Sequence, residues 1–242
     1  MRGPYFAVSL LAIGMAALGT GTACGQNYPT KLVRIVTAAA GSANDWSSRV
    51  IAQELTASLG QPVIVENRGG LGAEVVAKAP PDGYTLLVYG GAAWLLPFLR
   101  DNVPWDPLRD FAPVTLALTS PNIVVVHPSL PVKSIKELIA LARARPGELN
   151  YAAGTIGASP HLSTELFNAM ARVKFVRVGY KGTGPSVIAL MGVGVHLMFA
   201  GLGSVAPHIK TGRLRALAVS SAQPSALAPD LPTVASFLPG YE

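Results

Sequence analysis

The chain has 242 residues, of which 50% are hydrophobic and 13% are charged, and its formal net charge is +6. The positive charges are scattered and form no basic run or basic–aromatic patch, so the sequence lacks the pattern of a nucleic-acid-binding protein. One cysteine and four histidines without metal-ligand spacing predict neither an internal disulfide nor a metal centre. We therefore expect no metal, no cofactor and no nucleic-acid partner. The length suits two α/β domains.

The N-terminal residues have the layout of a secretory signal peptide. Arg2 precedes a short apolar run at residues 5–18, and small residues follow it. This run is too short to span a bilayer, so we predict that residues 1–25 are a cleaved signal peptide. Cys24 ends a tetrapeptide, residues 21–24, that partly resembles a lipobox. Its first position is Gly where a larger aliphatic residue is usual, so lipidation at Cys24 is the less favoured alternative.

After this segment, strand-like and helix-like patterns alternate along the chain. Residues 31–37 alternate and are rich in β-branched side chains, which predicts a strand, and apolar residues at helical spacing between residues 50 and 59 predict a helix. Further strands are predicted at residues 62–67, 84–89, 149–153, 175–180, 195–200 and 214–220, and further helices at 71–79, 134–145, 160–172, 184–191 and 205–211. This alternation is typical of parallel sheets covered by helices.

Two stretches interrupt the alternation. Residues 97–113 are rich in proline and predict a surface loop with little regular structure. Residues 114–126 predict two extended runs separated by Ser120-Pro121. We place the crossover between two domains at this dipeptide.

Three loops between predicted strands and helices consist mainly of small residues. They span residues 40–45, 90–93 and 154–159. Small residues let a ligand approach the backbone, and the free N–H groups at a helix N-terminus favour negative charge. Ligands of α/β sheets bind at the carboxyl ends of strands, so two domains with such loops would form a cleft. Each loop taken alone is more typical of an ordinary strand-to-helix turn.

Four segments resemble the periplasmic substrate-binding proteins of tripartite tricarboxylate transporters, the Bug-type family. They are Gly60–Arg68, Ala77–Leu87, Tyr180–Gly182 and Gly212–Val219, and the weaker resemblance covers nearly all of residues 28–242. The resemblance implies a two-domain α/β Venus-flytrap fold with parallel-rich sheets flanked by helices. It also implies periplasmic location and a carboxylate held in the interdomain cleft by backbone amides and ordered waters.

The resemblance leads to a prediction of the domain boundaries. We predict domain 1 at residues 26–120, with residues 221–242 returning to it, and domain 2 at residues 121–220. Family members continue beyond the position of Glu242, so the first domain is expected to be incomplete at its C-terminus. The first loop also departs from the family pattern Pro-Gly-Gly-x-x-Asp, because Ala40-Gly41-Ser42 replaces its first three residues while Asp45 is kept.

The predicted function is capture of a small carboxylate, an organic acid or amino acid, for delivery to the membrane permease subunits of a tripartite transporter. We expect a monomer without catalytic residues. The predicted ligand-binding residues are Ala40, Gly41, Ser42, Asp45, Gly91, Ala92, Ala93, Thr155, Ile156, Gly157, Ser159, His161 and Tyr180.

Alternatives remain open for the function and for single residues. A secreted α/β enzyme acting on a carboxylate would need a nucleophile beside a base, and Ser159 lies close to His161 in sequence, although no Gly-x-Ser-x-Gly motif is present. A sensor that presents its ligand to a membrane receptor is a further alternative. His161 could be structural rather than pocket-lining. Asp45 could serve only to cap the helix that follows it.

Overall fold

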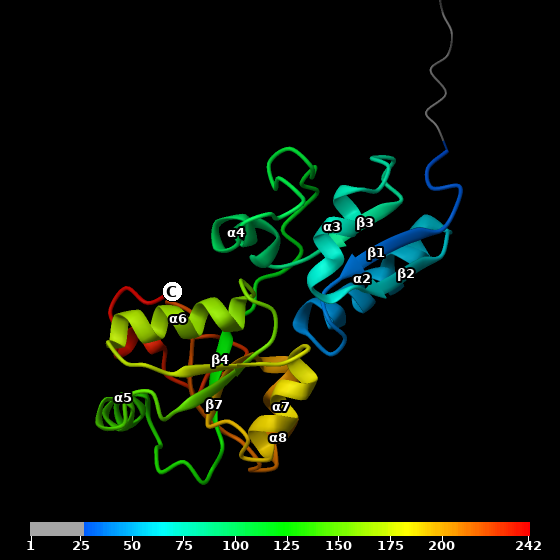
Figure 1. Cartoon of the computed structure of the whole chain (residues 1–242). Helices are drawn as coiled ribbons and strands as arrows, with labels where there is room; N and C mark the ends of the chain where they lie inside the picture. Colours follow the sequence, from blue (N-terminus) through cyan, green and yellow to red (C-terminus); the bar gives the residue numbers. More distant parts are fainter. Residues whose placement is uncertain (1–26) are drawn as a thin grey trace, which may run out of the picture. The chain divides into compact units, whose positions relative to one another are not determined.

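A computed structural model describes residues 27–242 of the chain (Figure 1). The predicted signal peptide and the lipidation alternative at Cys24 lie outside the described residues. One compact unit comprises Lys31–Glu242, and the fold described below belongs to it. Among the described residues, no helix combines the length and the apolar character needed to cross a bilayer.

Three parallel strands form the smaller of two sheets, in the order β2-β1-β3. Its strands are β1 (Val33–Thr37), β2 (Val63–Asn67) and β3 (Thr85–Val88), and its helical segments are α2 (Ala43–Leu59), η1 (Gly69–Leu71), α3 (Gly72–Ala77) and α4 (Ala92–Leu99). The central strand β1 is buried because α2 packs on it, with Ile51 and Leu55 against Ile35. The small sheet is parallel, as the alternation of strands and helices predicts.

Five strands form the large sheet, in the order β6-β5-β7-β4-β8. They are β4 (Asn122–Val126), β5 (Asn150–Ala153), β6 (Val176–Gly179), β7 (Leu197–Gly201) and β8 (Arg215–Val219). Strand β5 is parallel to β6 and β7, but β4 is antiparallel to β7 and β8. The sheet is therefore mixed, which the local pattern of β4 could not indicate.

Helices cover both faces of the large sheet (Figure 1). They are α5 (Ile135–Ala144), α6 (Ser159–Ala171), α7 (Thr183–Met191) and α8 (Leu202–Lys210). Val124 of β4 packs with Phe167 of α6 in one core cluster, whereas the neighbouring Val125 packs with Leu190 of α7 in another. Alternate residues of β4 thus face opposite helical layers, as expected of a strand buried on both sides. The predicted α/β fold with parallel-rich sheets flanked by helices is confirmed.

The C-terminal segment contacts the large sheet. Thr233 pairs with Val219 beside β8, and the short helix η2 (Val234–Ser236) follows it. Tyr241 is buried against Phe167, and its hydroxyl donates a hydrogen bond to the Ser163 carbonyl at 2.7 Å. These contacts differ from the predicted return of residues 221–242 to the first domain. The boundaries of both domains stay a prediction.

The two irregular stretches also differ in detail from expectation. Residues 114–119 are exposed and form no strand, so only the second predicted run becomes β4. Helix α4 includes Pro97, at the start of the predicted proline-rich loop. A proline has no N–H to donate to the carbonyl four residues earlier. That carbonyl, of Ala93, instead accepts a hydrogen bond from the Trp105 indole at 3.0 Å.

Candidate functional site

The loops at the carboxyl ends of strands from both sheets approach one another closely. A Cβ atom placed on Gly182, after β6, would lie 2.8 Å from the Cβ of Ala39, after β1. A Cβ on Gly157, after β5, would lie 3.7 Å from the Cα of Ala92, at the start of α4. A Cβ on Gly90 would lie 3.7 Å from Asn44. The three predicted loops therefore lie in one region, and the approach of Gly182 to Ala39 is close enough to require a glycine.

Asp45 organises the first of these loops. Its carboxylate accepts hydrogen bonds from the Gly41 amide at 2.9 Å, from Asn67 Nδ2 at 2.9 Å and from Arg49 Nε at 3.0 Å. Burial alone would raise the pKa of Asp45, but the hydrogen bonds from Asn67, Gly41 and Arg49 outweigh it and lower that pKa. Because protein groups occupy both oxygens, we assign Asp45 to shaping the loop.

Ser42 caps helix α2 in the same loop. Its side chain accepts a hydrogen bond from the Asp45 amide at 3.2 Å, and the helix begins at the next residue. This arrangement is the N-cap expected of a serine at that position. Gly41 has a φ of +76° and its amide is bonded to Asp45, so the turn is fixed by its own residues. Ala40 lies within this turn.

The second loop leads into α4 and is largely buried. Ala92 is 4% exposed and Ala93 is completely buried, where it packs with Leu96 and Trp105. Ala93 therefore offers no side-chain surface to a ligand. Gly91 precedes these residues and lines a cavity of about 420 Å³.

The third loop, residues 154–158, is held at both ends by side chains. Arg177 Nη2 donates to the Gly154 carbonyl at 2.6 Å, and the Gly157 amide donates to His161 Nδ1 at 3.2 Å. Between these bonds, the N–H groups of Thr155 and Ile156 have no acceptor within the described part of the chain. Two adjacent free N–H groups just before helix α6 are suited to binding an anion.

The remaining candidate residues differ in their surroundings. Ser159 Oγ accepts a hydrogen bond from Asn122 Nδ2 at 2.7 Å, and His161 is bonded to Gly157. Ser159 and His161 therefore do not form the nucleophile–base pair that a hydrolase needs. The Tyr180 ring packs against the core beneath α7, and its hydroxyl lies about 4.0 Å from a Cβ built on Gly194. The Tyr180 ring thus contributes to a core cluster of the large sheet.

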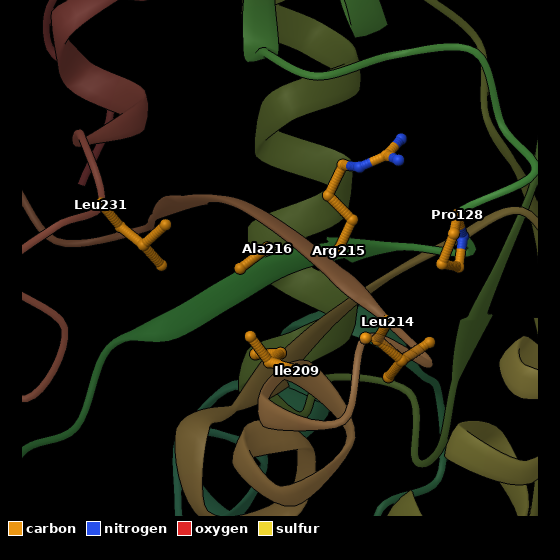
Figure 2. Close-up of a pocket in the computed structure, with 7 residues that line it drawn as sticks. Pro128, Ile209, Leu214, Arg215, Ala216 and Leu231 are labelled. Carbon is orange, nitrogen blue, oxygen red and sulfur yellow. The ribbon is translucent and has the colours of Figure 1, made fainter.

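Two cavities help to locate the site. The cavity of about 420 Å³ is lined by Gly91, Ser159, Leu162, Ser163, Leu166 and Glu242, so it adjoins two of the predicted loops. A pocket of about 390 Å³ lies beside β8 and contains no predicted site residue (Figure 2). There the Arg215 side chain extends away from Ile209 and Leu214, and its Nη1 donates to the Val132 carbonyl at 2.9 Å. We therefore place the candidate site at the loops.

Four residues at the site are absent from the sequence-based prediction. Asn67 binds Asp45, Arg177 binds the loop at Gly154, Asn122 binds Ser159, and Gly182 lies against Ala39. Asn67 and Gly182 lie inside the segments that carry the family resemblance, which could have drawn attention to them. Arg177 and Asn122 are strand residues whose partners are distant in sequence, and no local pattern singles them out.

Comparison with known proteins gives a consistent result. The family model described as the tripartite tricarboxylate transporter family receptor matches residues 47–241. Protein BugT of Bordetella pertussis is 38% identical over 223 residues, which cover 89% of this chain and 68% of that protein. A UPF0065 protein from the tcbD-tcbE intergenic region of a Pseudomonas species is 34% identical, with 96% of this chain and 71% of that protein covered.

Solved structures agree with the sequence comparisons. Rpa4515 of R. palustris, solved with adipate, superposes with a TM-score of 0.82 at 36% identity, covering 89% of this chain and 74% of that one. MatC (Rpa3494) from Rhodopseudomonas palustris, solved with bound malate, has a TM-score of 0.80 at 30% identity, with 89% and 74% covered. The periplasmic binding protein BugD has a TM-score of 0.80 at 30% identity, with 89% and 76% covered.

Proposed function

Because this chain belongs to the tripartite tricarboxylate transporter receptor family, we propose that it captures a small carboxylate at the loops that follow its strands. The observation that carries this proposal is the pair of free N–H groups at Thr155 and Ile156, in a loop that lies against the start of α4. The related Rpa4515 and MatC were solved with adipate and malate, and both molecules are carboxylates.

The charges around the loops favour binding through backbone donors. Arg49 is bonded to Asp45 and to Asn67 Oδ1, and Arg177 is bonded to the Gly154 carbonyl. Lys181 is exposed to solvent. Both arginines are thus held by protein partners, although the buried Nε of Arg177 has none among the described residues. In the third loop, the amides of Thr155 and Ile156 lack an acceptor in the described part of the chain. An anion at this position would also benefit from the N-terminal dipole of α6, which has 13 residues.

The family is one of solute receptors, and the hydrogen bonds of Ser159 to Asn122 and of His161 to Gly157 agree with a role in binding rather than hydrolysis. We propose that the protein is exported, acts in the periplasm as a monomer, and delivers its ligand to the permease subunits of a tripartite transporter. Ligand that contacts loops from both sheets would favour a closed arrangement of the predicted domains 26–120 and 121–220.

A thermal-shift screen followed by calorimetry tests the proposed function. The purified protein would be mixed with adipate, malate and aspartate, and with the neutral diamide of adipate as the matched control. A true ligand at a hundred times its Kd should stabilise the protein by about 2.7 kcal/mol. Stabilisation by a carboxylate but not by the diamide is the expected result. Equal stabilisation by both would show that the negative charge is not recognised.

A further inference from the structure

Two side chains of different chemistry hold the ends of the loop at residues 154–158. Arg177, on β6, donates to the Gly154 carbonyl at the beginning of the loop. His161, in the first turns of α6, accepts from the Gly157 amide near its end. A guanidinium stays charged throughout the physiological range, whereas an imidazole titrates within it. The two ends of the loop therefore respond differently to pH.

The hydrogen bond to Gly157 requires the neutral form of His161. Nδ1 must present its lone pair to the Gly157 N–H, so the neutral ring carries its proton on Nε2. In the protonated ring both nitrogens are donors, and Nδ1–H would face the Gly157 N–H directly. Protonation therefore replaces the hydrogen bond with a repulsive contact between two N–H donors.

The groups around His161 favour the neutral ring at neutral pH. Burial lowers the pKa of His161, the positive charge of Arg177 lowers it further, and the Glu165 carboxylate one helical turn away opposes this partly. On β5, in register with Arg177, the Tyr151 hydroxyl donates a hydrogen bond to Glu165. From α4, the residues that face Gly157 are alanine and leucine and carry no charge.

Gly157 packs against α4, so its amide cannot readily turn to another acceptor when this bond is lost. Its φ is +80°, and a Cβ at this position would lie 3.3 Å from Leu99 Cδ1 and 3.7 Å from Leu96 Cδ1. The loop therefore lies tightly against α4, and Ile156 extends the same apolar cluster. A shift of the Gly157 amide would move the free N–H groups of Thr155 and Ile156, which directly precede it.

We propose that His161 is a positioning residue, which holds the anion-binding loop through the Gly157 amide and releases that end of the loop when it becomes protonated. The positioning rests on the geometry of the free protein, and the effect on ligand affinity rests on the function proposed above. The Arg177 bond persists on acidification, so the change is confined to the end of the loop near Gly157. Bound carboxylate is then released more readily as the pH falls.

An NMR titration of the unliganded protein tests the positioning directly. The amide of Gly157 and the ring nitrogens of His161 should titrate together as the pH falls below about 6.5, the ordinary imidazole pKa, because the pKa of His161 is lowered. In His161→Asn, Oδ1 replaces Nδ1 as an acceptor that does not titrate, so the Gly157 amide should stay constant. His196→Asn is the matched control, because His196 Nδ1 accepts the Asn150 amide at 2.9 Å, at the opposite end of β5. A Gly157 amide that fails to follow His161, or that titrates unchanged in His161→Asn, overturns the proposal.

The pH dependence of adipate binding tests the functional consequence. Wild-type affinity should fall roughly tenfold more than that of His161→Asn over the same range, since one lost hydrogen bond at a buried site costs about that factor. Adipate itself is protonated as the pH falls, and this affects both proteins equally, so comparing wild type with His161→Asn removes its effect. Identical pH profiles for wild type and His161→Asn would contradict the release mechanism. If adipate does not bind, the choice of ligand in the proposed function fails, and the Gly157 titration still decides the role of His161.

Discussion

The Trp105 indole donates a hydrogen bond to the Ala93 carbonyl at 3.0 Å, and this carbonyl is the one that Pro97 leaves without a helical donor. The contact explains how a proline is accommodated within α4. It also attaches the proline-rich stretch to the beginning of the helix that contacts Gly157. A residue far from the free amides thus stabilises the surface against which the third loop packs.

The first prediction follows from this contact. Trp105→Phe should lower the free energy of unfolding by about 1–3 kcal/mol, because it leaves a buried carbonyl without a donor. Pro97→Ala restores an N–H four residues after Ala93, so the cost of Trp105→Phe should be smaller in that background. Urea unfolding of the two single variants and the double variant measures both effects. Trp46→Phe, at a position 70% exposed, is the control and should change stability little.

The second prediction concerns the Asp45 network. Asp45→Asn should destabilise the protein by about 1–3 kcal/mol at pH 7, because the carboxylate loses its charge-assisted bonds to Arg49, Asn67 and the Gly41 amide. The folded-state pKa of Asp45 is lowered, so its contribution is complete above the unfolded-state pKa of about 3.9. The contribution is lost as the pH falls through the lower folded-state value.

Urea unfolding of wild type and Asp45→Asn at pH 7 and pH 3 measures this dependence. The difference in the free energy of unfolding between the two proteins should narrow at pH 3. This pH lies below the unfolded-state pKa of about 3.9, so the wild type takes up a proton at Asp45 when it unfolds. Asp101→Asn, at an exposed position, should show little difference at either pH. If the free energy of unfolding differs between wild type and Asp45→Asn by the same amount at both pH values, the lost stability comes from packing and not from charge.

Local patterns in the sequence predict the positions of the elements well, because alternation and turn residues act over a few positions. Strands β2 and β6 lie within the predicted residues 62–67 and 175–180. The pairing of the strands does not follow from local patterns. The antiparallel insertion of β4 between β7 and β8, and the burial of Tyr241 in the large sheet, depend on partners far along the chain.

The same distinction applies to the site. The small residues of the three loops can be predicted, because a turn between a strand and a helix is a local pattern. From the sequence, the possible capping role falls to Asp45, whereas in the structure Ser42 is the cap. The bonds from Arg177 to Gly154 and from Asn122 to Ser159 join residues separated by 23 and 37 positions, and no spacing rule connects them. Whether Tyr180 faces the loops or the core is likewise decided by the packing of α7.

The third prediction concerns the close approach of Gly182 to Ala39. Gly182→Ala adds a methyl group 2.8 Å from the Ala39 Cβ, at a φ of +111°. Gly212→Ala is a reference for a positive φ without a steric contact, because its φ is +70° and nothing lies within 4 Å of the added Cβ. Gly212→Ala should cost the left-handed backbone strain of about 1–2 kcal/mol. Gly182→Ala should cost more, because its ψ of −178° at this φ is essentially restricted to glycine and because the added methyl group meets Ala39.

Ala39→Gly provides the second half of this test. In the double variant Ala39→Gly/Gly182→Ala the steric cost should disappear while the backbone strain at position 182 remains, so part of the lost stability should return. Thermal and urea unfolding measure these differences. If Gly182→Ala costs no more than Gly212→Ala, or if Ala39→Gly restores nothing, the two loops do not make the contact described.

The last prediction separates a backbone site from a salt bridge. Lys181 is exposed and lies next to Gly182, so a contribution to carboxylate binding would be screened by solvent and salt. Lys181→Ala should therefore weaken adipate binding by less than about fivefold, and the weakening should be smaller at moderate than at low ionic strength. Gly157→Val should abolish binding, because a β-branched residue disfavours a φ of +80° and the loop must change its conformation. Calorimetry at low and moderate salt measures both variants. Loss of binding in Lys181→Ala with retention in Gly157→Val would mean that a salt bridge, and not the free amides of Thr155 and Ile156, holds the carboxylate.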